Sequence, residues 1–377
     1  MELIAPKKTL LRLLQRCQGV ADKKAAMPVL ANVLLVAEGD QLKVAATDLY
    51  VSVRGSLDAE VKRAGSVAIP ARDVFDRVRH MPDGPVQITV GNGSATTLTG
   101  VGSKRRYTLH GLPGSEFPKL PEMTDDTSKM DLPVLVLSKL IARTHFAIST
   151  DETRAHLNSA LFECEDSVVR MVTTDGHRLT KMEEKVEGLD AKTTMLIPLK
   201  AVQELRKLLD EATDKGTAAI TVAQSGPNAF FELDGISFTV KLVDAQFPPY
   251  DAVIPAVTDR AVQAPRTLLS DALKAVALAA SDRTGGVKLA VADDALRITS
   301  ESPESGNGFD EVAIDYQGPE ITVGFNAKYL LDVLNVIDFD DISLGLSGEL
   351  DPALIRPVSP DEETADDYIA VVMPMRI

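Results

Sequence analysis

VLANVLLVAEGDQLKVAATDL (residues 29–49) sets two runs of alternating apolar residues on either side of a Glu-Gly-Asp turn. Apolar residues at every second position predict half-buried antiparallel strands, and the short turn joins them as a hairpin. The pattern returns around Glu-Asp-Ser in HLNSALFECEDSVVRMVTTDGHRL (156–179) and around Ala-Asp-Asp in GGVKLAVADDALRITSES (285–302). The chain therefore contains three copies of one hairpin.

Single residues keep the same spacing around these hairpins. Asn32 and Asn158 are 126 residues apart, Asp48 and Asp175 are 127 apart, and Pro70 and Pro198 are 128 apart. Such a period is much longer than that of a solenoid, and each copy is large enough to have its own core. A chain of 377 residues also exceeds the size of one hydrophobic core. We predict three related domains, 1–125, 126–258 and 259–377; three unrelated α+β domains are the alternative.

Each copy also carries two stretches with helical periodicity. They cover residues 6–18, 70–81, 137–147, 198–211, 265–280 and 324–337. In the first stretch, Leu10, Leu11, Leu13 and Leu14 form an apolar stripe while lysines and arginines occupy the other faces. Further alternating strands follow, such as PVQITV (85–90) and DISLGL (341–346). The predicted fold class is α+β, with two helices per copy packed on antiparallel sheets.

Charge is distributed unevenly between these helices and the rest of the chain. The six stretches hold 15 Lys and Arg and seven Asp and Glu, a net +8, whereas the whole chain carries −15 and the remainder therefore −23. A surface lined by the helices would be positive and suited to DNA phosphates. These helices show no aromatic interleaving of the kind that stacks single-stranded bases, so contact with the duplex backbone fits better. The alternative is that the charges form ordinary solvated helix faces.

Composition points to a cytoplasmic protein without a cofactor or metal. Only Cys17 and Cys164 are present, without a C-x-x-C pair, and no run of eighteen apolar residues occurs. The five histidines show no spacing typical of metal ligands.

TDGHRL (174–179) could suggest a hydrolase built from Asp175, His177 and a serine such as Ser159. However, the chain has no G-x-S-x-G, H-E-x-x-H or phosphate-loop motif. Asp48 also repeats Asp175 in a copy that lacks the histidine. We therefore predict a structural turn shared by two copies, and no enzymatic activity.

Ordered motifs along the whole chain resemble those of the bacterial DNA polymerase III β subunit, the sliding clamp family. The motifs are MPVLANVLL (27–35), ATDL (46–49), LNSALFE (157–163), TDGHRL (174–179), KLVDAQFPPY (241–250), GFNAKYLLDVLN (324–335) and VVMPMRI (371–377). The resemblance implies a head-to-tail homodimer that forms a closed ring with its helices inside. It implies a DNA polymerase processivity factor whose partners are duplex DNA, a clamp loader, the replicative polymerase and other proteins with clamp-binding motifs. A clamp paralogue that serves repair or an accessory polymerase instead of the replicase is the alternative.

The resemblance also implies a pocket for partner peptides between the second and third domains. The matching positions are Leu157, Thr174, Gly176, His177, Arg178, Leu179, Pro248, Val253, Val371, Val372, Met373, Pro374, Met375 and Arg376. Leu, Val, Met and Pro would supply an adaptable apolar floor, and Arg178 and His177 would orient the peptide. Many relatives carry a basic residue where Ala252 stands, so peptide preference is expected to differ.

Two further sets of residues follow from the same resemblance. For DNA contact the matching positions are Lys24, Arg72, Arg154, Lys200, Asn326 and Tyr329, with Lys7, Lys8, Arg12 and Arg16 as electrostatic lining. For the dimer interface they are Tyr107, Leu109, Leu278 and Ala279. The acidic run 151–153 beside Arg154 departs from what a DNA-contacting loop should carry.

Overall fold

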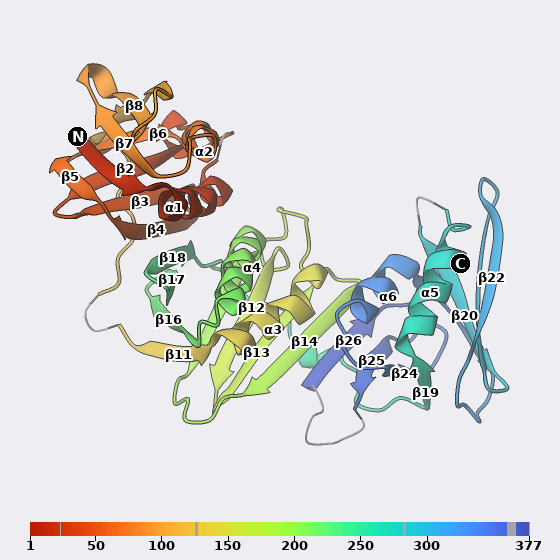
Figure 1. Cartoon of the computed structure of the whole chain (residues 1–377). Coiled ribbons are helices and arrows are strands. Elements are labelled where there is room, and N and C mark those ends of the chain that lie inside the picture. Colours follow the sequence, from red (N-terminus) through yellow and green to blue (C-terminus); the bar gives the residue numbers. More distant parts are fainter. Residues whose placement is uncertain (23, 125–126, 282–283, 360–366, 377) are drawn as a thin grey trace. The chain divides into compact units, whose positions relative to one another are not determined.

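The computed structural model describes residues 1–22, 24–124, 127–281, 284–359 and 367–376. These residues group into two compact units, Met1–Leu135 with Gln203–Leu242, and Val136–Val202 with Val243–Ile377. Figure 1 shows the helices and strands and labels many of them along the chain. Within the described ranges, no helix is both long and apolar enough to cross a membrane.

The predicted threefold repeat is visible in the order of the elements. Each copy runs strand, helix, four strands, helix, three strands, and the first copy adds the short strands β5 and β10. Its elements are β1 (Glu2–Pro6), α1 (Lys7–Val20), β2 (Asn32–Glu38), β3 (Gln41–Thr47), β4 (Val51–Asp58), β5 (Glu60–Arg63), β6 (Gly65–Pro70), α2 (Ala71–Arg79), β7 (Pro85–Val90), β8 (Ala95–Gly100), β9 (Arg106–His110) and β10 (Leu112–Pro113).

The second and third copies repeat that order. The second comprises β11 (Lys129–Pro133), α3 (Val134–Thr144), β12 (Ser159–Glu165), β13 (Val168–Thr174), β14 (Arg178–Lys185), β15 (Thr193–Pro198), α4 (Leu199–Asp214), β16 (Ala219–Ser225), β17 (Asn228–Leu233) and β18 (Ile236–Lys241). The third comprises β19 (Arg260–Pro265), α5 (Arg266–Ala277), β20 (Gly286–Ala292), β21 (Ala295–Ser302), β22 (Gly306–Ala313), β23 (Ile321–Asn326), α6 (Ala327–Leu334), β24 (Asp341–Leu346), β25 (Ala353–Val358) and β26 (Asp367–Val372).

The α+β fold class and the helix positions are confirmed, with small shifts at the ends. Proline precedes the first residue of α1 to α5, because its fixed φ suits a helix start and it has no N–H to leave unpaired. In the third copy the helix begins later than expected, because the Gly-Phe-Asn segment still belongs to β23. The side chain of Asn326 then caps α6 by accepting a hydrogen bond from the Lys328 N–H.

Two sheets continue from one copy into the next. The nine-stranded sheet has the order β10-β6-β2-β3-β4-β18-β17-β16-β11, and the eight-stranded sheet the order β15-β12-β13-β14-β26-β25-β24-β19. The joining pairs, β4 with β18 and β14 with β26, are both antiparallel. The remaining sheets are β5-β1-β7-β8-β9 and β22-β21-β20-β23, so β9 and β22 lie at sheet edges in the described part of the chain.

The register is the same in all three copies. Rows of directly opposite residues run Leu3, Ile88, Leu98, Tyr107 in the first copy, Met130, Val222, Phe231, Phe238 in the second, and Val262, Leu344, Ile355, Ala370 in the third. At the joining pairs the last two rows continue to Val53 in β4 and Thr180 in β14. Val53 and Thr180 lie opposite the sixth residues of β3 and β13. Gly308 in β22 lies opposite the sixth residue of β21, so it is the equivalent position in the third copy.

The predicted hairpins are confirmed. The turns Asp166-Ser167 and Asp293-Asp294 have positive φ at both residues, as two-residue hairpin loops require. Cys17 and Cys164 are free and buried, and burial raises the pKa of the Cys17 thiol to about 12.

Candidate functional site

A cavity of about 170 Å³ lies at the β14–β26 junction, within the second compact unit. It is lined by Leu157, Thr174, Gly176, Arg178, Leu179, Pro248, Tyr250, Val253, Val371 and Met373. Leu179 and Val371, which face each other across the junction, are buried and belong to the apolar cluster beneath the cavity. Val253 and Met373 are exposed at its rim. The cavity therefore offers an apolar floor with a mobile thioether at the edge, which suits apolar side chains of varied shape.

The turn between β13 and β14 shapes one wall. Thr174 Oγ1 donates to the Arg178 carbonyl (2.6 Å), and Asp175 Oδ1 accepts from the N–H groups of His177 (2.9 Å) and Arg178 (3.1 Å). Gly176 has φ +93°, a conformation that other residues adopt only with strain. Because the turn's backbone donors are satisfied internally, its shape does not depend on a ligand.

The first copy builds the same turn from different residues. Asp48 Oδ1 accepts from the N–H groups of Tyr50 (2.9 Å) and Val51 (2.6 Å), and Leu49 takes the positive φ of +77°. This agrees with the predicted structural role of Asp48 and Asp175.

The residues of the hydrolase alternative are engaged separately. Ser159 is fully buried and donates to the His156 carbonyl, while His177 stacks on Tyr329 with ring centroids 6.4 Å apart. Asp175 forms an ion pair with Arg178 (3.0 Å). No nucleophile–base–acid chain is formed by these three residues.

Arg178 connects the cavity to α6. Its side chain is only 6% exposed, and it donates to Asp175 (3.0 Å), to Asp332 of α6 (2.7 Å) and to the Phe146 carbonyl (2.6 Å). The guanidinium also lies over the rings of Tyr329 (4.5 Å) and Phe146 (5.1 Å). Two carboxylates and two rings thus fix its orientation, as expected for a planar, always charged group.

Tyr250 is a cavity residue that the resemblance did not single out, although it ends the quoted KLVDAQFPPY motif. Its ring packs edge-on to Phe247 (6.5 Å), and its hydroxyl donates to Glu163 Oε2 (3.1 Å). Burial, with the nearby Glu163 carboxylate, raises the pKa of Tyr250 to about 12, so the hydroxyl remains a donor.

Five of the fourteen predicted pocket residues do not line the cavity. They are His177, Val372, Pro374, Met375 and Arg376. Val372 is fully buried in the sheet opposite Arg178, and His177 is exposed. Met375 donates its N–H to the Gly324 carbonyl (2.8 Å), which anchors the C-terminal segment beyond the cavity.

Family models of the DNA polymerase III beta subunit match nearly the whole chain. The N-terminal domain model matches residues 1–121, the central domain model 131–249 and the C-terminal domain model 251–376. The chain belongs to the DNA polymerase III beta subunit family.

Curated relatives and solved structures agree with this family. The chain is 34% identical to the beta sliding clamp of Pseudomonas putida and 32% identical to that of Vibrio cholerae, covering 100% of both chains in each case. The DNA polymerase sliding clamp of Pseudomonas aeruginosa has a TM-score of 0.91 at 31% identity, with both chains fully covered. A clamp from Bartonella birtlesii, solved with bound griselimycin, has a TM-score of 0.92 at 33% identity, again with full coverage.

Most of the cations predicted to face DNA in this beta subunit family member already have acidic neighbours. Arg72 lies 3.6 Å from Asp76, Arg154 lies 2.9 Å from Asp151, and Lys7 donates to the Met81 carbonyl and to Asp83. Arg12 and Arg16 both contact Glu211. Lys8 and Lys24 are exposed, and Lys200 is half-buried in the first turn of α4. The two uncharged residues predicted to contact DNA also have partners. Asn326 caps α6, and the Tyr329 ring stacks on His177.

The residues predicted for the family's dimer interface differ in exposure. Leu278, directly after α5, is 82% exposed, and Tyr107 in β9 is half-buried. Leu109 and Ala279 are buried within their own chain. Phe309 in β22, which the sequence did not single out, is 65% exposed. Leu278 and Phe309 are therefore large apolar side chains near or on the free edge strand β22.

Proposed function

We propose that this protein is a sliding clamp, a non-catalytic processivity factor that encircles duplex DNA as a head-to-tail homodimer and tethers the replicative DNA polymerase. Membership of the DNA polymerase III beta subunit family supports the role. The observation that supports the ring is that two sheets continue from copy to copy, whereas β9 and β22, which belong to the two remaining sheets, lie at sheet edges among the described strands.

β9 and β22 are equivalent to the strands that pair at the two internal junctions. In both internal junctions, the last strand of one copy pairs with the strand equivalent to β22. The last long strand of the first copy is β9, and we assign it to β22 of a second chain. Pairing β9 with β22 would satisfy the unpaired N–H and C=O groups of these two edge strands and would close the ring.

The internal register specifies which residues would meet. Tyr107 corresponds to Phe238 and Ala370, and Gly308 corresponds to Val53 and Thr180. Tyr107 of one chain would therefore lie opposite Gly308 of the next. A side chain built on Gly308 would meet Ala279 and Val276, so this face of β22 is the one covered by α5. Tyr107 would then pack against the end of α5, where Leu278 is exposed.

The domain boundaries 1–125, 126–258 and 259–377 form part of this proposal. They fall close to the ends of the matched ranges 1–121, 131–249 and 251–376. The cavity lined by Arg178 and Tyr250 would lie where the second domain meets the third. We assign it to short partner peptides, because its apolar floor and fixed polar wall suit one or two inserted apolar side chains. Griselimycin bound to the Bartonella birtlesii clamp supports a ligand site in this family.

The remaining partners and the location follow from the role. A closed ring needs a clamp loader to open it around DNA, and other proteins with clamp-binding peptides would share the same cavity. Contact with DNA would be sequence-independent and made to phosphates by the helix surface. A bacterial replication protein of this kind works in the cytoplasm.

Retention on DNA tests encirclement directly. The protein is loaded by its clamp loader on a nicked circular plasmid, and bound protein is measured before and after the plasmid is linearised. We expect retention on circles and rapid loss from linear ends, because topology and not affinity holds a ring. Equal retention on both would overturn the proposal.

A further inference from the structure

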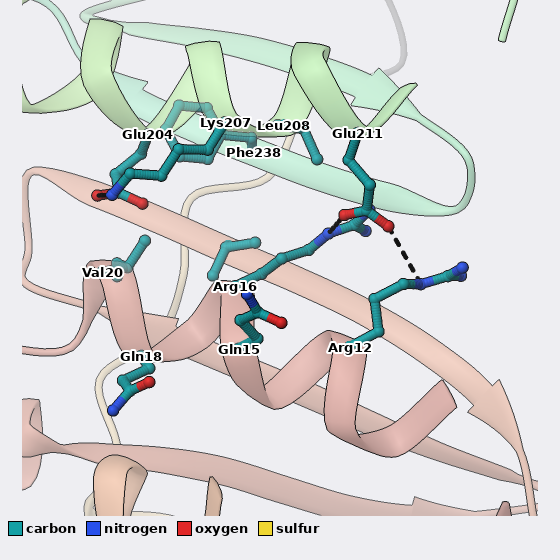
Figure 2. Close-up of a pocket in the computed structure, with 12 residues that line it drawn as sticks. Arg12, Gln15, Arg16, Gln18, Val20, Glu204, Lys207, Leu208, Glu211 and Phe238 are labelled. Atoms are coloured by element: carbon teal, nitrogen blue, oxygen red, sulfur yellow. Dashed lines mark hydrogen bonds and ion pairs between the residues drawn. The ribbon is translucent and has the colours of Figure 1, made fainter. Parts of the chain in front are cut away.

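A second, larger hollow of about 750 Å³ lies between α1 and α4, within the first compact unit. Its floor includes Val53 and Phe238, the residues that face each other across the β4–β18 junction. Figure 2 shows α1 on one side and α4 on the other, with Arg12 and Arg16 reaching across toward Glu211. The hollow thus opens between two of the six helices that the proposed function turns toward DNA.

Several cations converge on one carboxylate in this hollow. Arg16 donates from both Nε (3.0 Å) and Nη2 (2.6 Å) to Glu211 Oε2, and Arg12 Nε lies 3.5 Å from Glu211 Oε1. Lys215, one turn further along the chain, lies 2.7 Å from the same Oε1. Lys215 also lies 3.7 Å from Asp234, so three positive charges share two carboxylates and leave a local excess of one positive charge.

Arg16 is held in place but not fully satisfied. Its side chain is 12% exposed, and its Nη1 atom is buried without a hydrogen-bond partner among the described residues. A guanidinium has five N–H donors, and a carboxylate oxygen that accepts from Nε and Nη2 uses only some of them. A backbone phosphodiester carries the same single negative charge as the carboxylate, and its two non-bridging oxygens can accept from separate N–H groups of the guanidinium.

We propose that Glu211 occupies the place of a DNA backbone phosphate between Arg12 and Arg16, and that this hollow binds a phosphodiester group of the encircled duplex when the carboxylate moves aside. The inference rests on the proposed function. A sliding ring must not be held at one position by any single contact. Because a phosphate entering this hollow must first displace the Glu211 carboxylate, its net binding there is weakened.

A neighbouring pair provides a matched control. Glu204 lies on the same helix, lines the same hollow and pairs with Lys207 (2.7 Å), which is itself largely exposed. Glu204→Gln removes one negative charge from the same place as Glu211→Gln, but it releases neither arginine. A difference between the two variants therefore reports the arginine pair and not net charge.

The experiment measures binding of a short labelled DNA duplex by fluorescence anisotropy across a range of salt concentrations. We expect Glu211→Gln to bind more tightly than wild type and to steepen the dependence of log affinity on log salt by about one, the value for one added phosphate contact on duplex DNA. Glu204→Gln should change the slope much less. Adding Arg16→Gln to Glu211→Gln should return the slope to the wild-type value.

A second variant separates the position of the carboxylate from its charge. Glu211→Asp keeps the charge but shortens the side chain, so we expect a smaller gain in the same direction. It also serves if Glu211→Gln does not fold. Inorganic phosphate is titrated in as a probe at constant ionic strength: competition that weakens duplex binding of Glu211→Gln more than that of Glu204→Gln supports a phosphate site.

Failure of this inference and failure of the proposed function give different results. Equal effects of Glu211→Gln and Glu204→Gln, or a gain that survives Arg16→Gln, would overturn the role of Glu211 while wild-type retention on circular DNA still supports the clamp. Equal retention on circular and linear plasmid by wild type would instead overturn the clamp itself.

Discussion

Arg178 links the floor of the small cavity to the core around it. It is almost fully buried, and its partners Asp175 and Asp332 are themselves only 15% and 23% exposed. Removing this buried cation leaves Asp175 without its arginine partner and Asp332 with the largely exposed Lys328 (2.7 Å), in a medium that solvates both carboxylates poorly. This residue therefore matters to folding as well as to the cavity wall.

We expect Arg178→Ala to lower the free energy of unfolding by about 3 kcal/mol, the range measured when one partner of a buried ion pair is removed. The measurement is urea denaturation followed by circular dichroism. Arg297→Ala is the control, because its pair with Glu311 is exposed and should contribute less than about 1 kcal/mol. Similar losses in the two variants would contradict this account of Arg178.

Single residues also show where sequence reasoning stops. The resemblance to the family predicted nine of the ten cavity residues, because most of them lie in or beside short motifs such as TDGHRL that occur in the same order along the chain. Tyr250 was missed although its motif was quoted, since only the fold shows its ring turned toward Phe247. The pairing of Arg16 with Glu211 joins residues 195 positions apart and has no local pattern.

At the scale of helices and strands, local chemistry predicts most of the fold. Alternation and turn residues gave the hairpins, and proline marked the starts of five helices. The junctions β4–β18 and β14–β26 were not predicted, because any antiparallel edge strand offers the same row of N–H and C=O groups. The position of α1 beside α4 likewise depends on the β4–β18 junction beneath the two helices, and neither helix sequence predicts it alone.

The link between α1 and α4 should depend on pH. Burial raises the pKa of Glu211, but hydrogen bonds from Lys215 and Arg16 outweigh it and bring the pKa below its ordinary 4.5. Since the folded-state pKa lies below the unfolded one, the carboxylate stabilises the fold above pH 4.5 and that contribution is lost as pH falls through the depressed value.

Thermal unfolding of wild type and Glu211→Gln between pH 7 and pH 3.5 measures this contribution. At pH 7 the variant should melt about 1–2 °C lower, as expected for about 1 kcal/mol from a partly exposed charge cluster. The gap should narrow only below about pH 4.5. A gap that is constant over the whole range would mean that Glu211 acts through packing and not through its charge.

At the scale of the whole molecule, the decisive quantity is the register between β9 of one chain and β22 of the next. If Tyr107 lies opposite Gly308, then Thr108 lies opposite Asn307 and Arg106 opposite Phe309. Thr108 and Asn307 are both exposed. Directly opposite residues of an antiparallel pair have Cβ atoms about 5 Å apart, close enough for a disulfide after a small adjustment.

The double variant Thr108→Cys with Asn307→Cys should therefore form a covalent dimer under mild oxidation, seen on a non-reducing gel, while each single variant should not. The native Cys17 and Cys164 are buried and should add no background. Thr108→Cys with Phe309→Cys is the register control, because that pair is diagonal and its Cβ atoms are about 7 Å apart or more. Preferential cross-linking of the control would mean that the strands meet two residues out of the register repeated inside the chain. Once oxidised after loading, the Thr108–Asn307 variant should stay on a circular plasmid in high salt and in denaturant, since two covalent junctions then close the ring around the DNA.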